Sequence, residues 1–222
     1  MGQIFQRAKQ YVDRLDPEHL GWFIEIGTSR NGDDGSTRTI ASWATGFERK
    51  LYTVDIDHRN IDFVTKLQIP NVKTWLGSGE NFLSNFPSHL GFISVLYLDN
   101  FDWDWHPERT EKLPPLEFAP NGRPVIGDPK NAILEQKYHY QELGIEMNNV
   151  NSQAAHIAQM VIAMPIMAEQ SVVICDDTWY NKSWGHYSGK SGAVVPYLIS
   201  QGYRVAETEE YPVYGTILTR GI

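Results

Sequence analysis

The sequence lacks the features of a disulfide-stabilised or membrane-spanning protein. Cys175 is the only cysteine, so no disulfide can form within the chain, and a cytoplasmic location is expected. No apolar run approaches the length of a membrane span, which argues against a membrane partner. Of the 222 residues 41% are hydrophobic, and no linker-like stretch separates two halves. Residues 1–222 are therefore expected to form one globular domain with a sizeable core.

Basic charge is also scarce. The chain has 19 lysines and arginines against 27 aspartates and glutamates, a formal net charge of −8, and no basic run. Such a chain is a poor partner for a phosphate backbone, so nucleic acid is not expected as a main partner. The G-x-S-x-G motif of one large hydrolase class is missing as well.

What the sequence does contain is an alternation of strand and helix patterns. Strands are predicted at 21–27, 50–57, 72–77, 91–100, 171–177, 203–210 and 213–220. Helices are predicted at 3–15, 35–44, 80–86, 151–170 and 191–202. The last two strands are joined by a turn around Tyr211 and Pro212, too short for a parallel crossover. The prediction is an α/β fold: a Rossmann-like doubly wound sheet of about seven strands, mainly parallel, with an antiparallel C-terminal hairpin.

Two helix boundaries are also predicted. Ser36 or Thr37 is expected to cap the helix at 35–44, because hydroxyl side chains bind the free amides of a helix start. Pro165 is expected to kink or end the helix at 151–170, since proline has no amide hydrogen to donate.

The loop after the first predicted strand, "FIEIGTSRNGDDGST", is rich in glycine but fits neither phosphate-binding motif. Glu25 stands where the dinucleotide fingerprint has its first glycine, and Asp33, not lysine, follows Gly32. The loop contains two acidic residues, Asp33 and Asp34, and one basic residue, Arg30. Acidic residues there would repel a pyrophosphate. The bound group is therefore expected not to be a phosphate.

The pattern E-x-G followed by small residues resembles motif I of the class I S-adenosylmethionine-dependent methyltransferases. The resemblance implies that Glu25 serves the amino-acid end of the ligand and that Gly27, with Thr28 and Ser29, brings backbone close to it. The loop is longer than the family pattern, with its second glycine at Gly32 or Gly35, so contacts beyond Gly27 stay open. The alternative is that Glu25 only caps the following turn.

Further segments resemble the same family in the same order, over about residues 20–104 and 150–220. "YTVDID" resembles the second strand, whose terminal acid takes the ribose hydroxyls; Asp55 stands there beside Ile56, with Asp57 as the second choice. "WLGSGENF" resembles the loop that frames the adenine, at Ser78, Gly79 and Glu80. "LYLDN" resembles motif IV, with Asp99 as a further cofactor contact, and "VVICDDTW" resembles the fifth strand. The implied cofactor is S-adenosyl-L-methionine.

Three acids end the fourth and fifth predicted strands: Asp99, Asp176 and Asp177. Neighbouring parallel strands would bring them together, and a hard divalent cation would relieve their repulsion. All-oxygen ligation predicts Mg²⁺, or Ca²⁺ or Mn²⁺. The arrangement resembles the catechol-type metal-dependent O-methyltransferases and the branch with cephalosporin hydroxylases and macrolide-sugar methyltransferases. The alternative is that these aspartates are helix caps.

Candidates for the general base follow the same strand ends. His106 and His186 can each take a proton from a substrate hydroxyl. Asp102 stands where the catechol-type branch has its lysine base and is the third candidate. His156, on a long predicted helix, is interpreted as structural.

Aromatic residues gather beyond these acids, at Trp103, Trp105, Trp179 and Trp184. They predict either an apolar wall for an acceptor with a ring or a small satellite core. The polar insertion at 105–150 is too long for an ordinary loop, and it predicts a lid or an oligomer contact, hence a possible homo-oligomer.

The resemblance implies a methyltransferase acting on a hydroxyl of a small molecule, with O- versus N-methylation left open. The alternatives are a hydroxylase-like enzyme on the same scaffold and a non-catalytic binding subunit.

Overall fold

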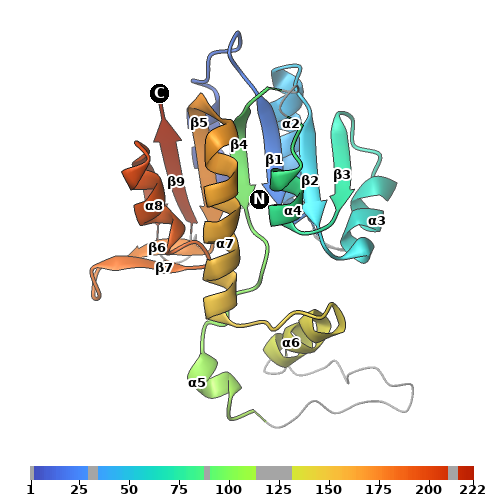
Figure 1. Cartoon of the computed structure of the whole chain (residues 1–222), viewed down its shortest axis with the longest axis vertical. Coiled ribbons are helices and arrows are strands. Elements are labelled where there is room, and N and C mark those ends of the chain that lie inside the picture. The colour runs from blue at the N-terminus through green and yellow to red at the C-terminus, as the bar shows by residue number, and fades with distance from the viewer. Residues whose placement is uncertain (1–2, 30–34, 88–90, 114–131, 210–214) are drawn as a thin grey trace.

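A computed structural model describes residues 3–29, 35–87, 91–113, 132–209 and 215–222. Its centre is a seven-stranded sheet of order β3-β2-β1-β4-β5-β9-β8 (Figure 1). The strands are β1 (Trp22–Ile26), β2 (Leu51–Asp55), β3 (Val72–Leu76), β4 (Ile93–Leu98), β5 (Met167–Asp176), β8 (Arg204–Glu209) and β9 (Gly215–Arg220). The first five are parallel, while β9 runs antiparallel to both β5 and β8. The predicted Rossmann-like sheet with its antiparallel hairpin is confirmed.

Helices cover both faces of the sheet because its central strands are apolar on both sides. Successive side chains of a strand point to opposite faces, so Phe23 joins one core cluster and Ile24 the other. The first cluster packs under α1 (Gln3–Val12) and α2 (Gly35–Gly46). The second packs under α4 (Gly79–Ser84), α7 (Asn149–Ala163) and α8 (Val194–Ser200). The remaining helix of the sheet region, α3 (His58–Lys66), packs against β2 and β3.

Several predicted boundaries need correction. Ser36 and Thr37 lie inside the first turn of α2, so neither is its N-cap. The helix predicted at 151–170 ends at Ala163, a short 3₁₀ turn (Met164–Ile166) contains Pro165, and residues 167–170 already belong to β5. The proline prediction is confirmed, but the β-strand was predicted too short. The turn at Tyr211 and Pro212 lies outside the described residues.

Three features were not predicted. One is α3, whose N-cap is Asp57. Another is a separate antiparallel hairpin of β6 (Thr178–Asn181) and β7 (His186–Gly189) directly after β5. The third is helix within the insertion, where α5 (Pro107–Thr110) and α6 (Ala132–Glu142) lie below the sheet in Figure 1. No helix in the described part of the chain is long and apolar enough to cross a bilayer.

Candidate functional site

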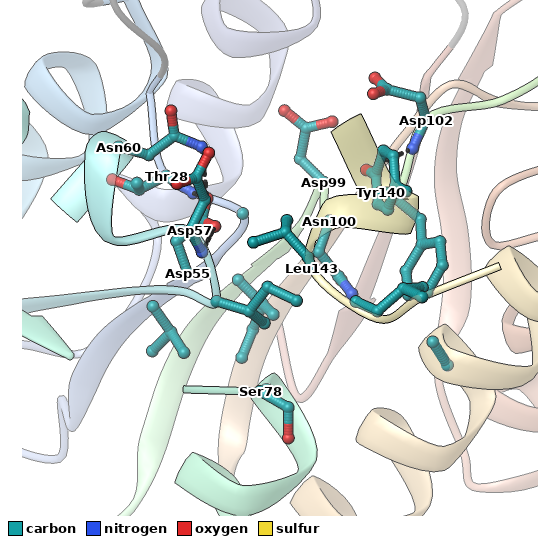
Figure 2. A pocket seen from close by; sticks show the side chains of 18 of the residues that line it. Thr28, Asp55, Asp57, Asn60, Ser78, Asp99, Asn100, Asp102, Tyr140 and Leu143 are labelled. Atoms are coloured by element: carbon teal, nitrogen blue, oxygen red, sulfur yellow. Dashed lines mark hydrogen bonds between the residues drawn. The ribbon is translucent and has the colours of Figure 1, made fainter. Parts of the chain in front are cut away.

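A cavity of about 800 Å³ opens at the carboxyl ends of β1, β2 and β4. In a parallel sheet this edge is where ligands bind. Nine of the ten predicted cofactor contacts line it: Gly27, Thr28, Ser29, Asp55, Ile56, Ser78, Gly79, Glu80 and Asp99. Figure 2 shows Asp55 and Asn60 on one side of this space, with Asp99, Leu143 and Tyr140 across from them.

Gly27 allows the first loop to approach the end of β4. Its φ of +93° lies in the left-handed region that favours glycine. A Cβ atom at Gly27 would lie 2.5 Å from the backbone nitrogen of Asn100 and 2.6 Å from the carbonyl carbon of Asp99. Both neighbours are backbone atoms, so any side chain here would push the two strand ends apart.

Glu25, the tenth predicted contact, is fully buried and is not among the lining residues. Its Oε2 atom accepts hydrogen bonds from Thr37 Oγ1 at 2.7 Å and from Thr53 Oγ1 at 2.6 Å. Burial raises the pKa of Glu25 to about 7. The carboxyl group therefore ties α2 and β2 to β1 behind the pocket wall.

Asp55 is held by three donors at the end of β2. Oδ1 accepts from the Asp57 amide at 2.8 Å, and Oδ2 accepts from the Thr28 amide and the Asn60 side chain, both at 3.2 Å. Burial raises the pKa of Asp55 above its ordinary value. The two hydrogen-bonded oxygens keep the carboxylate in one orientation on the pocket wall (Figure 2).

Asp57, the second choice, has other partners. It caps α3 by accepting from the Arg59 amide at 2.9 Å, and its Oδ2 lies 2.9 Å from His139 Nε2. Burial by itself would raise the pKa of Asp57, but the hydrogen bonds and charge of Arg59 lower it. Asp57 thus links β2 to the insertion.

The insertion covers one side of the pocket through α6 and the residues after it. His139 contacts both Asp57 and the guanidinium of Arg59. Tyr140 Oη accepts a hydrogen bond from the Asp102 amide at 3.0 Å, and its ring stacks on Phe101 with centroids 5.4 Å apart. The insertion is therefore attached both to the end of β2 and to the loop after β4.

The charged lining of the pocket is acidic. Six carboxylates and no lysine or arginine occur among the described residues that line it; the carboxylates belong to Asp55, Asp57, Glu80, Asp99, Asp102 and Glu135. Such a lining opposes phosphate groups and attracts positive charge. This agrees with the prediction from the first loop that the bound group is not a phosphate.

The three aspartates predicted to meet at the ends of β4 and β5 do so, because Leu98 pairs with Cys175 in the register. A side chain that was not predicted from the sequence lies among them. Lys190 Nζ is 2.8 Å from Asp99 Oδ1, 2.9 Å from Asp177 Oδ2 and 4.0 Å from Asp176 Oδ2. Within the described residues, no group of three or more His, Cys, Asp or Glu side chains is arranged to hold a metal ion.

Of the candidate bases, only Asp102 lines the pocket. His106 is the exposed residue that precedes α5, and His186 is exposed on β7 with its ring stacked on Trp184 at 5.7 Å. His156 is fully buried, with Nδ1 at 2.7 Å from Ser191 Oγ and Nε2 at 2.6 Å from the Asn100 carbonyl oxygen. Burial lowers the pKa of His156 to about 4, which fits a neutral structural ring.

The aromatic residues are divided between two places. Phe101 and Tyr140 stand on the pocket itself. Trp105 and Trp179 stack on each other with centroids 5.1 Å apart and so join the insertion to β6. Trp184, predicted to belong to the same aromatic cluster, is 71% exposed in the β6–β7 turn and stacks on His186.

No protein-family model and no curated protein sequence matches the chain. Solved structures do match. The O-methyltransferase NovP superposes with a TM-score of 0.54 at 10% identity, over 97% of this chain and 78% of that chain. This chain has a Rossmann-like methyltransferase fold.

Two other matches are more distant. A putative rRNA-methylase from Clostridium thermocellum has a TM-score of 0.49 at 11% identity, over 96% of both chains. The N-methyltransferase NodS from Bradyrhizobium japonicum WM9, in complex with S-adenosyl-L-homocysteine, has a TM-score of 0.44 at 10% identity, over 98% of this chain and 87% of that chain.

Proposed function

We propose that this protein is an S-adenosylmethionine-dependent methyltransferase that methylates a hydroxyl group of a small molecule. The observation that carries the proposal is the acidic pocket of about 800 Å³ at the ends of β1, β2 and β4. S-Adenosylmethionine carries a sulfonium, an ammonium and two ribose hydroxyls, which are cations and hydrogen-bond donors, and its single carboxylate leaves it with a net positive charge. Asp55 is placed to accept from a ribose hydroxyl, and the other carboxylates offset the positive charge.

The residues of the pocket would contribute mainly by positioning. Bound S-adenosylmethionine supplies an electrophilic methyl group. Phe101 and Tyr140 exclude water from the side of the pocket next to Asp99. Asp102 is the candidate that accepts the proton of the acceptor hydroxyl as the new oxygen–methyl bond forms, because it alone of the three candidates lines the cavity.

The divalent cation expected from the sequence does not fit the residues found at its place. Lys190 Nζ already lies within hydrogen-bond distance of Asp99 and Asp177. No step of the proposed reaction is therefore assigned to a metal.

Calorimetry on the purified protein tests the proposal. We expect saturable one-to-one binding of S-adenosylmethionine and of S-adenosylhomocysteine, and no binding of NAD or ATP, because the pocket repels phosphate. Tight binding of NAD, or no binding of either sulfur compound by folded protein, would overturn the assignment.

We further propose that α6 is part of a lid, which is one of the two roles predicted from the sequence for 105–150, the other being an oligomer contact; residues 114–131 of that segment lie outside the described part. The contact between His139 and Asp57 connects this lid to the pocket wall. His139→Ala removes it, and because the imidazole is one-third exposed we expect only about a 2- to 10-fold faster release of S-adenosylhomocysteine.

Stopped-flow fluorescence measures that release, and hydrogen exchange of residues 132–142 reports on the helix. The matched control is Gln141→Ala, an exposed position on the same helix. Equal release rates in wild type and His139→Ala would show that this contact does not retain the ligand.

A further inference from the structure

Lys190 is a buried lysine beneath three partly exposed aspartates. Its side chain is 4% exposed, against 28% for Asp99, 25% for Asp176 and 29% for Asp177. A lysine is almost never this buried without ionic partners. Here three carboxylates supply them, and the other oxygen of Asp99 accepts from Tyr97 Oη at 3.1 Å.

The backbone around Lys190 is fixed against the end of β5. The Lys190 amide donates to the Asp177 carbonyl oxygen at 3.0 Å, and the Ser191 amide donates to Thr178 Oγ1 at 3.0 Å. Gly189 adopts a φ of +92°, and a Cβ there would lie 1.8 Å from the Asp177 carbonyl oxygen. The close packing of these two segments leaves the lysine side chain directed at the aspartates.

The same segment is also tied to the end of β4. Ser191 Oγ bonds to His156 Nδ1 at 2.7 Å, and the other nitrogen of that ring bonds to the Asn100 carbonyl oxygen at 2.6 Å. His156 therefore holds the lysine segment and the residue after Asp99 at a set separation. The backbone that carries the lysine is therefore held in place by the fold, next to the aspartates.

One ammonium offsets only part of the negative charge of the three aspartates, and burial together with the charge of Asp99 raises the pKa of Asp176 well above its ordinary value. Three carboxylates meeting at adjacent strand ends repel one another. Burial alone would lower the pKa of Lys190, but the carboxylates of Asp99, Asp177 and Asp176 raise it well above its ordinary value.

A divalent ion and this ammonium compete for the same oxygens. Mg²⁺ and Ca²⁺ require oxygen ligands at about 2.0–2.6 Å. Asp99 Oδ1 and Asp177 Oδ2 are already 2.8 Å and 2.9 Å from Nζ, so an ion bound to both would collide with the ammonium or face its charge at close range.

We propose that Lys190 is a positioning residue whose ammonium takes the place of a divalent ion: it holds Asp99, Asp176 and Asp177 together, and the protein works without a metal. Because Asp99 lines the pocket, the lysine acts on the ligand site through that side chain. The inference goes beyond the proposed function, and its main test does not depend on activity.

The test titrates Mn²⁺ into chelator-treated protein and follows free Mn²⁺ by electron paramagnetic resonance. Wild type should show no specific Mn²⁺ site. Lys190→Met keeps the apolar stem but removes the charge, and it should gain one Mn²⁺ site whose affinity is at least about tenfold higher than any Mn²⁺ binding measured for wild type. Lys190→Arg should resemble wild type. Lys182→Met, an exposed lysine in the β6–β7 turn, is the matched control and should gain nothing.

Thermal unfolding provides the second measurement. Mn²⁺ should raise the midpoint of Lys190→Met and leave wild type unchanged, because only the variant has an open ion position. If Lys190→Met does not fold even with Mn²⁺, the wild-type titration and Lys190→Arg still decide the matter.

Two results would overturn the proposal. One is a tight Mn²⁺ site in wild type that Asp99→Asn removes. The other is a folded Lys190→Met that gains no ion affinity. S-Adenosylhomocysteine binding is measured in parallel, so a failure of the proposed function appears as absent ligand binding with the Mn²⁺ results unaffected.

Discussion

Replacing Asp55 with alanine is expected to weaken S-adenosylmethionine binding by roughly 10- to 150-fold, since an ionised hydrogen-bond acceptor contributes about 1.5–3 kcal/mol. Each carboxylate oxygen accepts more than one hydrogen bond, so the bonds from Thr28, Asn60 and Asp57 still leave capacity for a ligand hydroxyl. Those same bonds hold the carboxylate in place before the ligand arrives. Calorimetry with S-adenosylmethionine and S-adenosylhomocysteine measures the loss.

Asp55→Asn protects this experiment against a folding defect, because it keeps the shape of the side chain and removes only its charge. Asp62→Ala, an exposed aspartate on α3, is the control for a general loss of negative charge. We expect Asp55→Asn to show a smaller loss than Asp55→Ala and Asp62→Ala to bind as wild type does. If folded Asp55→Ala binds S-adenosylmethionine as tightly as wild type does, the ribose does not bind at the end of β2.

Glu25→Gln is expected to change how stability depends on pH. The pKa of Glu25 is raised from 4.5 to about 7, first of all by burial. The unfolded chain therefore loses this proton near pH 4.5, while the folded chain keeps it until about pH 7. The contribution of Glu25 to the free energy of unfolding is fully present below pH 4.5, the unfolded pKa. It falls by about 3 kcal/mol as the pH rises from there to the folded pKa of about 7.

Glutamine stays neutral throughout, so Glu25→Gln should lack that fall. Its free energy of unfolding relative to wild type should rise by about 3 kcal/mol between pH 4.5 and 8, as measured by urea unfolding. Glu18→Gln, at an exposed glutamate, is the control and should parallel wild type. Parallel pH profiles for Glu25→Gln and wild type would mean that the buried carboxyl group ionises as it does in the unfolded chain.

Much of the fold was predictable because it depends on local pattern. Apolar runs such as 91–100 and the short linker before the last strand led directly to the parallel sheet and its closing hairpin. The predicted pocket residues also came together, because parallel strands place their carboxyl ends on one edge. Boundaries were less predictable: residues 167–170 continue a helical pattern, yet Met167 pairs with Ile93 of β4 and the stretch forms the start of a strand.

The insertion shows where local pattern is insufficient. The helix α6 is amphipathic only weakly in its sequence, "AILEQKYHYQE", and its partners are Asp57 and the loop after β4, more than 30 residues away along the chain. Sequence spacing cannot indicate such contacts, because they depend on how the insertion folds back over the sheet edge. The same is true of His106 and His186, which share a residue type with a general base but are exposed outside the cavity.

The sequence by itself determined the sheet, the acidic character of the ligand edge and the meeting of Asp99, Asp176 and Asp177, since these follow from strand order and from residues at strand ends. Only the tertiary structure decided what lies among those aspartates. Lys190 is 13 residues beyond Asp177, and a separate hairpin, β6–β7, returns the chain so that the lysine amide bonds to the Asp177 carbonyl oxygen. A cluster of carboxylates is relieved by a nearby cation, by protonation of one of its members, or by both. Whether that cation is an ion or a side chain depends on where the chain returns.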